Sequence, residues 1–163
     1  MEFHEKRRCE MRIAFVGHAQ ISWQEKIKEA VKEQLRANAK RGTAVTCYLG
    51  GRGDFDAICA RACKELKAER LEIEAIYVMP YLGISEQARI KEMQRCGLCD
   101  GSLYPPIEGT PPKFAISKRN EWMVSNADLI IAYVAHDYGG AYQALQTARR
   151  RGKRIINLFD LEK

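Results

Sequence analysis

The sequence lacks the features that mark membrane and exported proteins. Its 163 residues contain no apolar run that approaches the roughly 20 residues of a membrane span, and the amino terminus carries no apolar segment typical of a signal peptide. Internal repeats, low-complexity tracts and a dividing linker are also absent. We therefore expect a cytoplasmic protein with one domain at residues 12–163, preceded by a flexible segment at residues 1–11.

The cysteines lack the partners that a metal or redox site requires. Cys96 and Cys99 form the single Cys-x-x-Cys pair, whereas a tetrahedral zinc site needs two further ligands. The pair does not follow a first strand, as it does in thioredoxin-like redox motifs. Cys59 and Cys63 lie on an apolar helical stripe, and Cys47 lies in a predicted strand. We expect no metal site, and we interpret these three residues as small core side chains.

Basic residues outnumber acidic ones, and the formal net charge is +6. This charge favours anionic ligands, among which nucleic acid is one candidate. The densest basic cluster, residues 149–154, lies at a predicted helix end, where the helix dipole favours cations. Because no interleaved aromatics accompany the cluster, we do not favour nucleic acid as the partner. Membrane binding is not expected, and self-association of the chain is left open.

Apolar runs alternate with helical patterns along the chain. The predicted strands are residues 12–17, 44–49, 73–79, 129–134 and 153–158. We expect Ser22, Asp54 and Ser117 to cap the helices that follow them. Alternating strands and helices predict an α/β protein with a three-layer Rossmann-like fold. Its mostly parallel sheet would have about five strands in the order 3-2-1-4-5. The connection at residues 80–115 is irregular, with a helix near residues 86–95.

Glycine turns and polar side chains follow several of these strands. In a parallel sheet the strand-to-helix loops meet at the carboxyl edge, and ligands bind where the strand order reverses. Glycines allow close backbone approach, and helix N-termini attract phosphate. The predicted ligand-binding residues are Gly17, His18, Gly50, Gly51, Arg52, Gly53, Asp54, Lys118, Arg119, Asn120, His136, Gly139 and Gly140. Their convergence at one edge predicts a site for a phosphate-bearing ligand.

Three segments carry a resemblance to a known family. They are Tyr-Leu-Gly-Gly-Arg-Gly-Asp-Phe-Asp at residues 48–56, Pro-Pro-Lys-Phe-Ala-Ile-Ser-Lys-Arg-Asn-Glu-Trp-Met at residues 111–123 and Ala-Asp-Leu-Ile-Ile-Ala-Tyr-Val-Ala-His-Asp-Tyr-Gly-Gly-Ala at residues 127–141. Together they strongly resemble the YpsA-like branch of the SLOG superfamily, whose members are often bacterial. The resemblance implies a Rossmann-like fold and a pocket for a nucleotide, NAD or ADP-ribose. It implies no settled biochemical activity.

The same superfamily includes the Lonely-guy phosphoribohydrolases, which this chain matches in part. Arg119 and Met123 match the Arg-x-x-x-Met segment of those enzymes, and Asp128 matches the aspartate that opens their next strand. The catalytic glutamate is not matched, because Tyr142 occupies its place with Gln143 beside it. Hydrolysis would therefore need another carboxylate, and the nearest candidates are Asp54, Asp56 and Asp137.

These observations lead to three hypotheses about function. The first is that the chain binds or senses a nucleotide or nucleotide-derived ligand. The second is that it is an N-glycosidic hydrolase or transferase acting on nucleoside 5′-monophosphates. The third is a nucleic-acid-associated protein, because the DNA-processing protein of the resembled superfamily binds single strands. The catalytic residues, the base and the number of phosphates are not indicated by the sequence.

Overall fold

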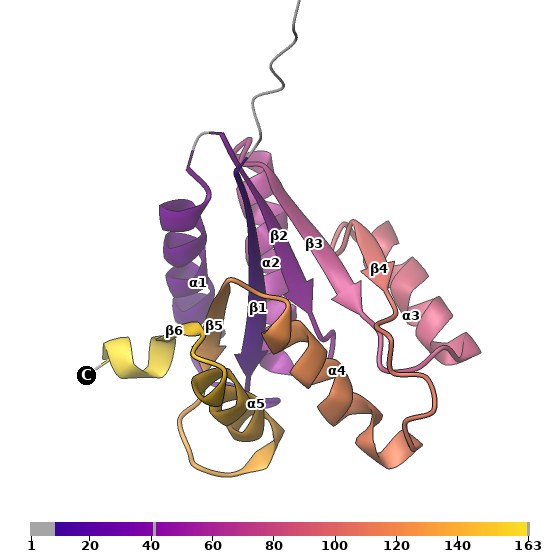
Figure 1. Ribbon diagram of the computed structural model, residues 1–163. Coiled ribbons are helices and arrows are strands. Elements are labelled where there is room, and N and C mark those ends of the chain that lie inside the picture. Colours follow the sequence, from indigo (N-terminus) through magenta and orange to yellow (C-terminus); the bar gives the residue numbers. More distant parts are fainter. Residues whose placement is uncertain (1–8, 41, 163) are drawn as a thin grey trace, which may run out of the picture.

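The computed structural model describes residues 9–40 and 42–162, which form a parallel sheet with helices on both faces (Figure 1). The sheet has six strands in the order β4-β3-β2-β1-β5-β6, and every adjacent pair is parallel. The strands are β1 (Cys9–Gly17), β2 (Thr43–Leu49), β3 (Ile73–Val78), β4 (Gly101–Leu103), β5 (Leu129–Tyr133) and β6 (Arg154–Asn157). The predicted fold class and the order of the five predicted strands are confirmed, and β4 adds a sixth strand beside β3.

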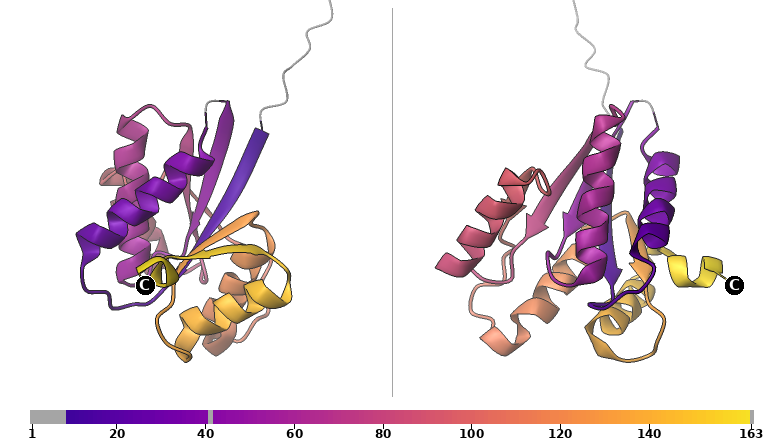
Figure 2. Two further views of the ribbon diagram at one scale, coloured as in Figure 1. Left: turned by 90° about the vertical axis from the view of Figure 1, so that its left-hand side faces the viewer. Right: turned by 180° about the vertical axis from the view of Figure 1, so that it is seen from behind.

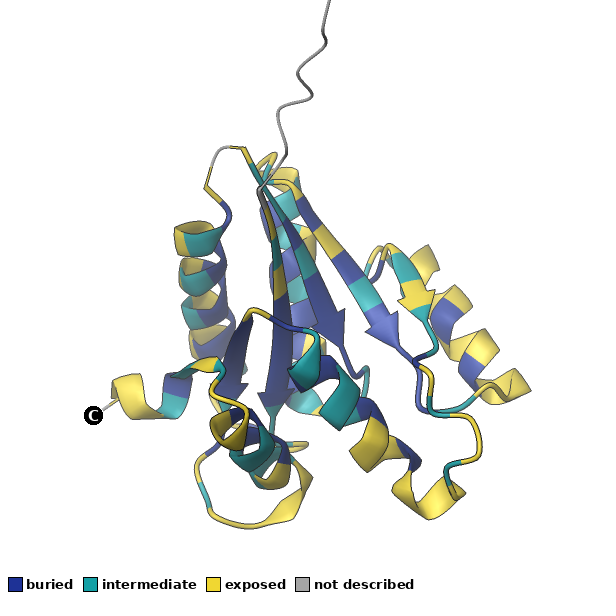
Figure 3. Cartoon of the chain, viewed as in Figure 1, coloured by how far each residue is buried: buried dark blue, intermediate teal, exposed yellow. Residues whose placement is uncertain are grey.

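Helices lie on both faces of the sheet, as the views from the side and from behind show (Figure 2). Helices α1 (Gln24–Asn38) and α2 (Asp54–Ala68) pack on one face, and α4 (Ala115–Ser125) and α5 (Gly139–Arg150) on the other. The short helix η2 (Leu158–Glu162) follows β6 beside α1. This three-layer arrangement buries the central strands on both sides (Figure 3).

Strand side chains alternate between two apolar cores because successive residues point to opposite faces. Ile13 and Phe15 of β1 face α1 and α2, whereas Ala14 and Val16 face α4 and α5. The predicted core positions of three cysteines are confirmed, since the side chains of Cys47, Cys59 and Cys63 are fully buried. Burial raises the pKa of the Cys59 thiol well above its usual value.

The connection at residues 80–115 contains more structure than the sequence predicts. It holds α3 (Ile84–Arg95), the short strand β4 and the 3-10 turn η1 (Pro112–Phe114). Cys99 is buried in a small cluster with Tyr77, Met79 and Ile90, and Cys96 is only partly buried. The two cysteines therefore lie in different environments at the end of α3.

The predicted helix caps differ from the observed helix starts. Helix α1 begins after Trp23, which has a left-handed φ of 60°, so the predicted capping box at Ser22 is wrong. Helix α4 begins at Ala115, which places Ser117 inside its first turn. The first strand begins at Cys9, earlier than predicted, and residues 1–8 of the predicted flexible segment lie outside the described residues. Within residues 9–40 and 42–162, no helix has the length and apolar character needed to cross a membrane.

Phe55 should be a major contributor to stability. Its side chain is 1% exposed and packs against Phe15, with the ring centroids 6.3 Å apart. We expect Phe55→Ala to lower the free energy of unfolding by about 3–5 kcal/mol, as large-to-small changes in cores do. The half-exposed Phe114 provides the control, because Phe114→Ala should cost less than about 1 kcal/mol. Equal losses in urea unfolding would contradict this account of the core.

Candidate ligand-binding site

A crevice lies at the carboxyl edge of the sheet, where the strand order reverses between β1 and β5. Its volume is about 120 Å³. The lining residues come from the ends of β1 and β2, the start of α2, helix α4 and the start of α5; the polar and glycine members are Gly17, Gly50, Arg52, Asp56, Arg119, Asn120 and Gly140. Parts of the chain that are distant in sequence therefore meet at the place where parallel sheets bind ligands.

Arg119 lines this crevice and is 2% exposed. Its Nη1 group donates to the carbonyl oxygens of Gly50 and Val78, at 2.8 Å each, and its Nε group donates to Asn120 Oδ1 at 2.9 Å. One guanidinium thus ties α4 to the ends of β2 and β3. Burial lowers the pKa of Arg119, and the nearby Asp56 carboxylate opposes this shift.

Asp56 is the carboxylate that faces the crevice. Its Oδ2 atom accepts a hydrogen bond from the Arg52 backbone N–H at 3.1 Å. Burial raises the pKa of Asp56 to about 6, although that hydrogen bond and the Arg119 charge favour the ionised form. Of the three carboxylates named from the sequence as alternative catalytic groups, Asp56 lines the crevice, whereas Asp54 hydrogen-bonds the backbone of a neighbouring loop and Asp137 is exposed.

Arg52 lines the crevice and is held by buried partners. Its Nη2 group pairs with Glu86 Oε1, and Glu86 Oε2 accepts a hydrogen bond from Tyr77 Oη at 2.7 Å. The guanidinium also lies over the Tyr81 ring, 5.7 Å from its centroid. The Nε atom is buried and has no hydrogen-bond partner within the described part of the chain. Arg52 therefore keeps one buried donor that no described group satisfies.

The glycine turn before α2 packs against the chain instead of opening toward a ligand. The backbone N–H groups of Asp54 and Phe55 donate to the carbonyl oxygens of Ala19 and His18, at 2.9 and 3.3 Å. The Asp54 carboxylate accepts the Ile21 N–H at 2.8 Å, so Asp54 anchors a loop and does not cap its own helix. A Cβ at Gly53 would come within 2.7 Å of the Ala19 backbone. The first amides of α2 are thus already used.

The start of α5 differs, because its first turn is open. The helix begins at Gly139 after Tyr138, no described side chain caps it, and its first turn contains no acidic residue. A Cβ added at Gly140 would meet no atom within 4 Å. The first N–H groups of an α-helix have no partner inside the helix and carry a partial positive charge. Here they adjoin both the crevice and a second cavity.

This second cavity has a volume of about 490 Å³ and contains three stacked rings. His18 stacks on His136 with ring centroids 3.8 Å apart, and His136 stacks on Tyr138 at 3.9 Å. His18 Nε2 accepts the Ala135 N–H at 2.8 Å, so its neutral form carries the proton on Nδ1. Burial lowers the pKa of His18, and the neighbouring His136 lowers it further.

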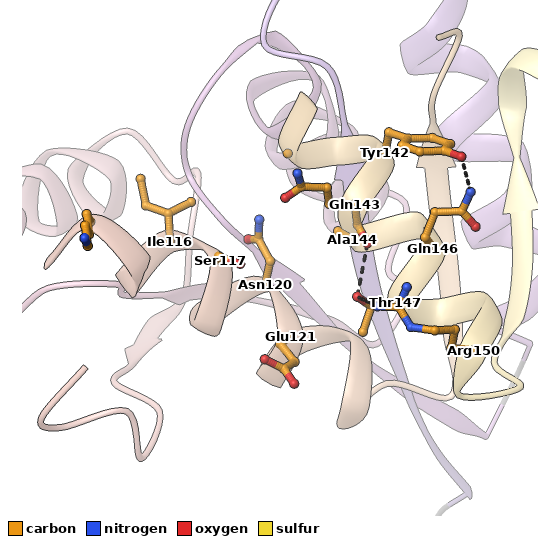
Figure 4. A pocket seen from close by; sticks show the side chains of 12 residues that line it. Ile116, Ser117, Asn120, Glu121, Tyr142, Gln143, Ala144, Gln146, Thr147 and Arg150 are labelled. Atoms are coloured by element: carbon orange, nitrogen blue, oxygen red, sulfur yellow. Dashed lines mark hydrogen bonds between the residues drawn. The ribbon is translucent and has the colours of Figure 1, made fainter. Parts of the chain in front are cut away.

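A third cavity of about 670 Å³ lies between α4 and α5 (Figure 4). Asn120 and Glu121 of α4 face Gln143, Thr147 and Arg150 of α5 across it. Ile116, Asn120 and Gly140 line both this cavity and the crevice, so the two are adjoining. The open start of α5 therefore borders all three cavities, each of which includes Gly140.

Most of the predicted site residues converge here, and four do not line these cavities. The convergent residues are Gly17, His18, Gly50, Arg52, Arg119, Asn120, His136, Gly139 and Gly140. Gly51 has a φ of 67° and packs so closely on Tyr77 that a Cβ would overlap its ring. Gly53 and Asp54 hold the loop at Ala19, and Lys118 is exposed and pairs with Glu121 at 3.3 Å.

Three residues that help to define the site are absent from the predicted ligand-binding set. Tyr138 could have been predicted, because it is an aromatic residue directly before the glycine pair. Asp56 was named as a carboxylate but not as part of the ligand site, although it lies one helical turn beyond Gly53. Glu86 could not have been found, because its contacts with Arg52 and Tyr77 depend on where α3 packs.

Arg151 and Lys153 of the basic cluster at residues 149–154 have partners on or after α4. Arg151 pairs with Glu121 at 2.8 Å and also contacts Ser125. Lys153 Nζ donates to the carbonyl oxygens of Ser125 and Ala127, at 3.0 Å each. These contacts join the end of α4 to the end of α5, where free carbonyls favour cations.

Comparison with known proteins shows similarity in fold. No family model and no curated protein sequence match the chain. Among solved structures, DNA processing protein A from Streptococcus pneumoniae matches with a TM-score of 0.62 and 18% sequence identity. DNA processing protein A from Helicobacter pylori, whose structure was studied for its binding of single-stranded DNA, matches with a TM-score of 0.54 and 17% identity.

These matches cover most of this chain but only part of the larger proteins. Each covers 89% of this chain, together with 49% of the Streptococcus chain and 63% of the Helicobacter chain. At such low identity the similarity establishes a shared Rossmann-like architecture and does not extend to particular residues.

Replacing Arg119 should destabilise the protein far more than replacing its neighbour Lys118. We expect Arg119→Met to lower the free energy of unfolding by at least about 2 kcal/mol, because two buried carbonyls would lose a donor at about 1–3 kcal/mol each. The control Lys118→Met removes an exposed ion pair and should cost no more than about 0.5 kcal/mol. Urea unfolding measures both values, and an unaffected Arg119→Met protein would refute the role assigned to Arg119.

Acid should destabilise the loop that His18 anchors. Because the folded state lowers the pKa of His18, the unfolded chain binds its proton more readily. Stability should therefore fall as the pH drops through 6.5 toward the lowered value. In His18→Gln the amide oxygen can accept the Ala135 N–H without titrating, so wild type should lose stability relative to this variant between pH 7.5 and 5. Urea unfolding measures the free energy of unfolding of both proteins. A difference between them that does not change with pH, or that changes with the opposite sign, would contradict this.

Proposed function

We propose that the chain binds a nucleotide or nucleotide-derived molecule by its phosphate at the start of α5. NAD, ADP-ribose and nucleoside monophosphates are the candidate ligands. The observation that carries the proposal is the uncapped first turn of α5, which lies where the strand order reverses and borders three adjoining cavities. On this proposal the chain acts as a binding or sensing protein of the YpsA-like branch of the SLOG superfamily.

The charges around the crevice support an anionic ligand. Arg119 and Arg52 both line it, and the buried Nε atom of Arg52 has no hydrogen-bond partner among the described residues. Both guanidinium groups are fixed by protein contacts before a ligand arrives, and each has a carboxylate nearby, Glu86 beside Arg52 and Asp56 beside Arg119. A helix N-terminus with preorganised cations nearby is a common arrangement for phosphate. The remainder of the ligand would then extend into one of the two larger cavities.

Binding of single-stranded DNA is a second candidate. It is favoured by the similarity in fold to DNA processing protein A, whose Helicobacter form was studied in its binding of single-stranded DNA. The net charge of +6 also favours a polyanion. Arg151 and Lys153, however, hold the helix ends together, which leaves fewer cations for a DNA backbone in that cluster.

Hydrolysis of an N-glycosidic bond is a third candidate, and Asp56 would be its acid–base group. The carboxylate lines the crevice, and a pKa of about 6 suits proton transfer near neutral pH. The Asp56 carboxylate already accepts a hydrogen bond from the Arg52 backbone, which uses part of its capacity to accept. Release of free base from a nucleoside monophosphate would demonstrate this activity.

Changing the charge at Gly140 tests the phosphate site directly. An aspartate there suits a helix start and has open space, but it repels an anion bound to the same turn. We expect Gly140→Asp to weaken binding of AMP at least about tenfold relative to Gly140→Asn, a neutral variant of similar size. Calorimetric titrations with AMP, NAD and ADP-ribose measure the effect, and melting curves check that both variants fold.

Assays of nucleotide binding, oligonucleotide binding and base release distinguish the three candidates. Equal affinities of Gly140→Asp and Gly140→Asn for every nucleotide would overturn the phosphate site. Tight binding of a labelled oligothymidine that weakens steeply between 50 and 200 mM salt, without binding of AMP, would favour the DNA candidate. Base released from AMP by wild type and not by Asp56→Asn would favour the hydrolase.

A further inference from the structure

We propose that the open face of Tyr138 is a platform on which the aromatic base of the ligand stacks. The inference rests on the proposed function and deepens it, because it specifies a ligand that carries a base beside its phosphate. Either a mononucleotide or a nucleotide within a single strand supplies this chemistry.

Tyr138 is the last ring of an ordered stack. His18, His136 and Tyr138 follow one another with centroid separations of 3.8 and 3.9 Å and interplanar angles of 12° and 15°. One face of the Tyr138 ring is covered by His136, and the residue is nevertheless 67% exposed. The outer end of the stack is therefore an aromatic surface without a ring partner within the described part of the chain.

Both histidines are held by contacts with other residues, which makes the platform rigid. His18 accepts the Ala135 N–H at 2.8 Å and meets the Tyr133 ring edge-on, with the centroids 6.3 Å apart. His136 Nδ1–H donates to the Tyr138 carbonyl oxygen at 3.1 Å, which closes the turn that carries the tyrosine. A base that stacks here would not have to order these rings first, and preorganisation of this kind favours binding.

The position of the stack matches the shape of a nucleotide. Tyr138 immediately precedes Gly139, the first residue of α5, and both line the 490 Å³ cavity with Arg52. A phosphate on the first amides of α5 would thus lie beside the tyrosine ring. Base–aromatic stacking tolerates any base, because every base has an aromatic face. The platform therefore favours ligands with a base over sugar phosphates and does not select one base.

Tyr138→Leu removes the platform and keeps an apolar side chain of moderate size. We expect it to weaken AMP binding roughly 5- to 150-fold, the range expected from the loss of one base–aromatic stack. Ribose 5-phosphate should bind wild type and Tyr138→Leu equally, because it has no base. Tyr138→Phe, which keeps the ring, should bind AMP within about twofold of wild type. Trp23→Leu, at another exposed aromatic residue, is the matched control and should leave AMP binding unchanged.

Calorimetric titrations separate failure of the platform from failure of the phosphate site. If AMP and ribose 5-phosphate bind equally, and Tyr138→Leu has no effect on AMP, the platform is wrong while the phosphate site stands. If AMP binding depends on Tyr138 but is indifferent to Gly140→Asp, the platform stands and the phosphate site is wrong. Failure of phosphate, ribose 5-phosphate, AMP and oligothymidine to bind wild type would overturn both. If oligothymidine binds and its binding requires Tyr138, while AMP does not bind, the base belongs to a nucleotide within a single strand.

Discussion

The crevice depends on one interaction, the contacts by which the buried Arg119 joins α4 to the ends of two strands. Its guanidinium donates to the carbonyl oxygens at the ends of β2 and β3 while its backbone belongs to α4. A buried guanidinium is costly unless such acceptors surround it. The same contacts fix the position of α4 over the carboxyl edge of the sheet, and this position creates the crevice.

Two helix starts at this edge have opposite roles. The first amides of α2 bind the loop at His18 and Ala19, which closes that end of the sheet and positions the loop. The first turn of α5 has no capping side chain among the described residues and borders open space. The closed start thus positions His18 at the base of the ring stack, and the open start remains available to an anion. The proposed anion site therefore lies at the start of α5 alone, whereas the sequence predicts ligand contacts from three glycine turns.

The strand order could be predicted because it follows from alternating apolar runs and the handedness of parallel connections. Strand β4 could not, since Gly101–Leu103 is only three residues long and includes a glycine. The burial of Arg119 also escaped prediction, because its acceptors are backbone carbonyls that every sequence contains. The different use of Gly53 and Gly140 depends on what packs against each residue, which local sequence does not encode.

The central claim is that the open start of α5 receives the anion, and amide chemical shifts test it most directly. A titration of the ¹⁵N-labelled protein with AMP should produce its largest shifts at the amides of Gly139, Gly140 and Ala141, with smaller changes at Arg52. Large shifts at the closed start of α2, with the α5 amides unmoved, would contradict the account.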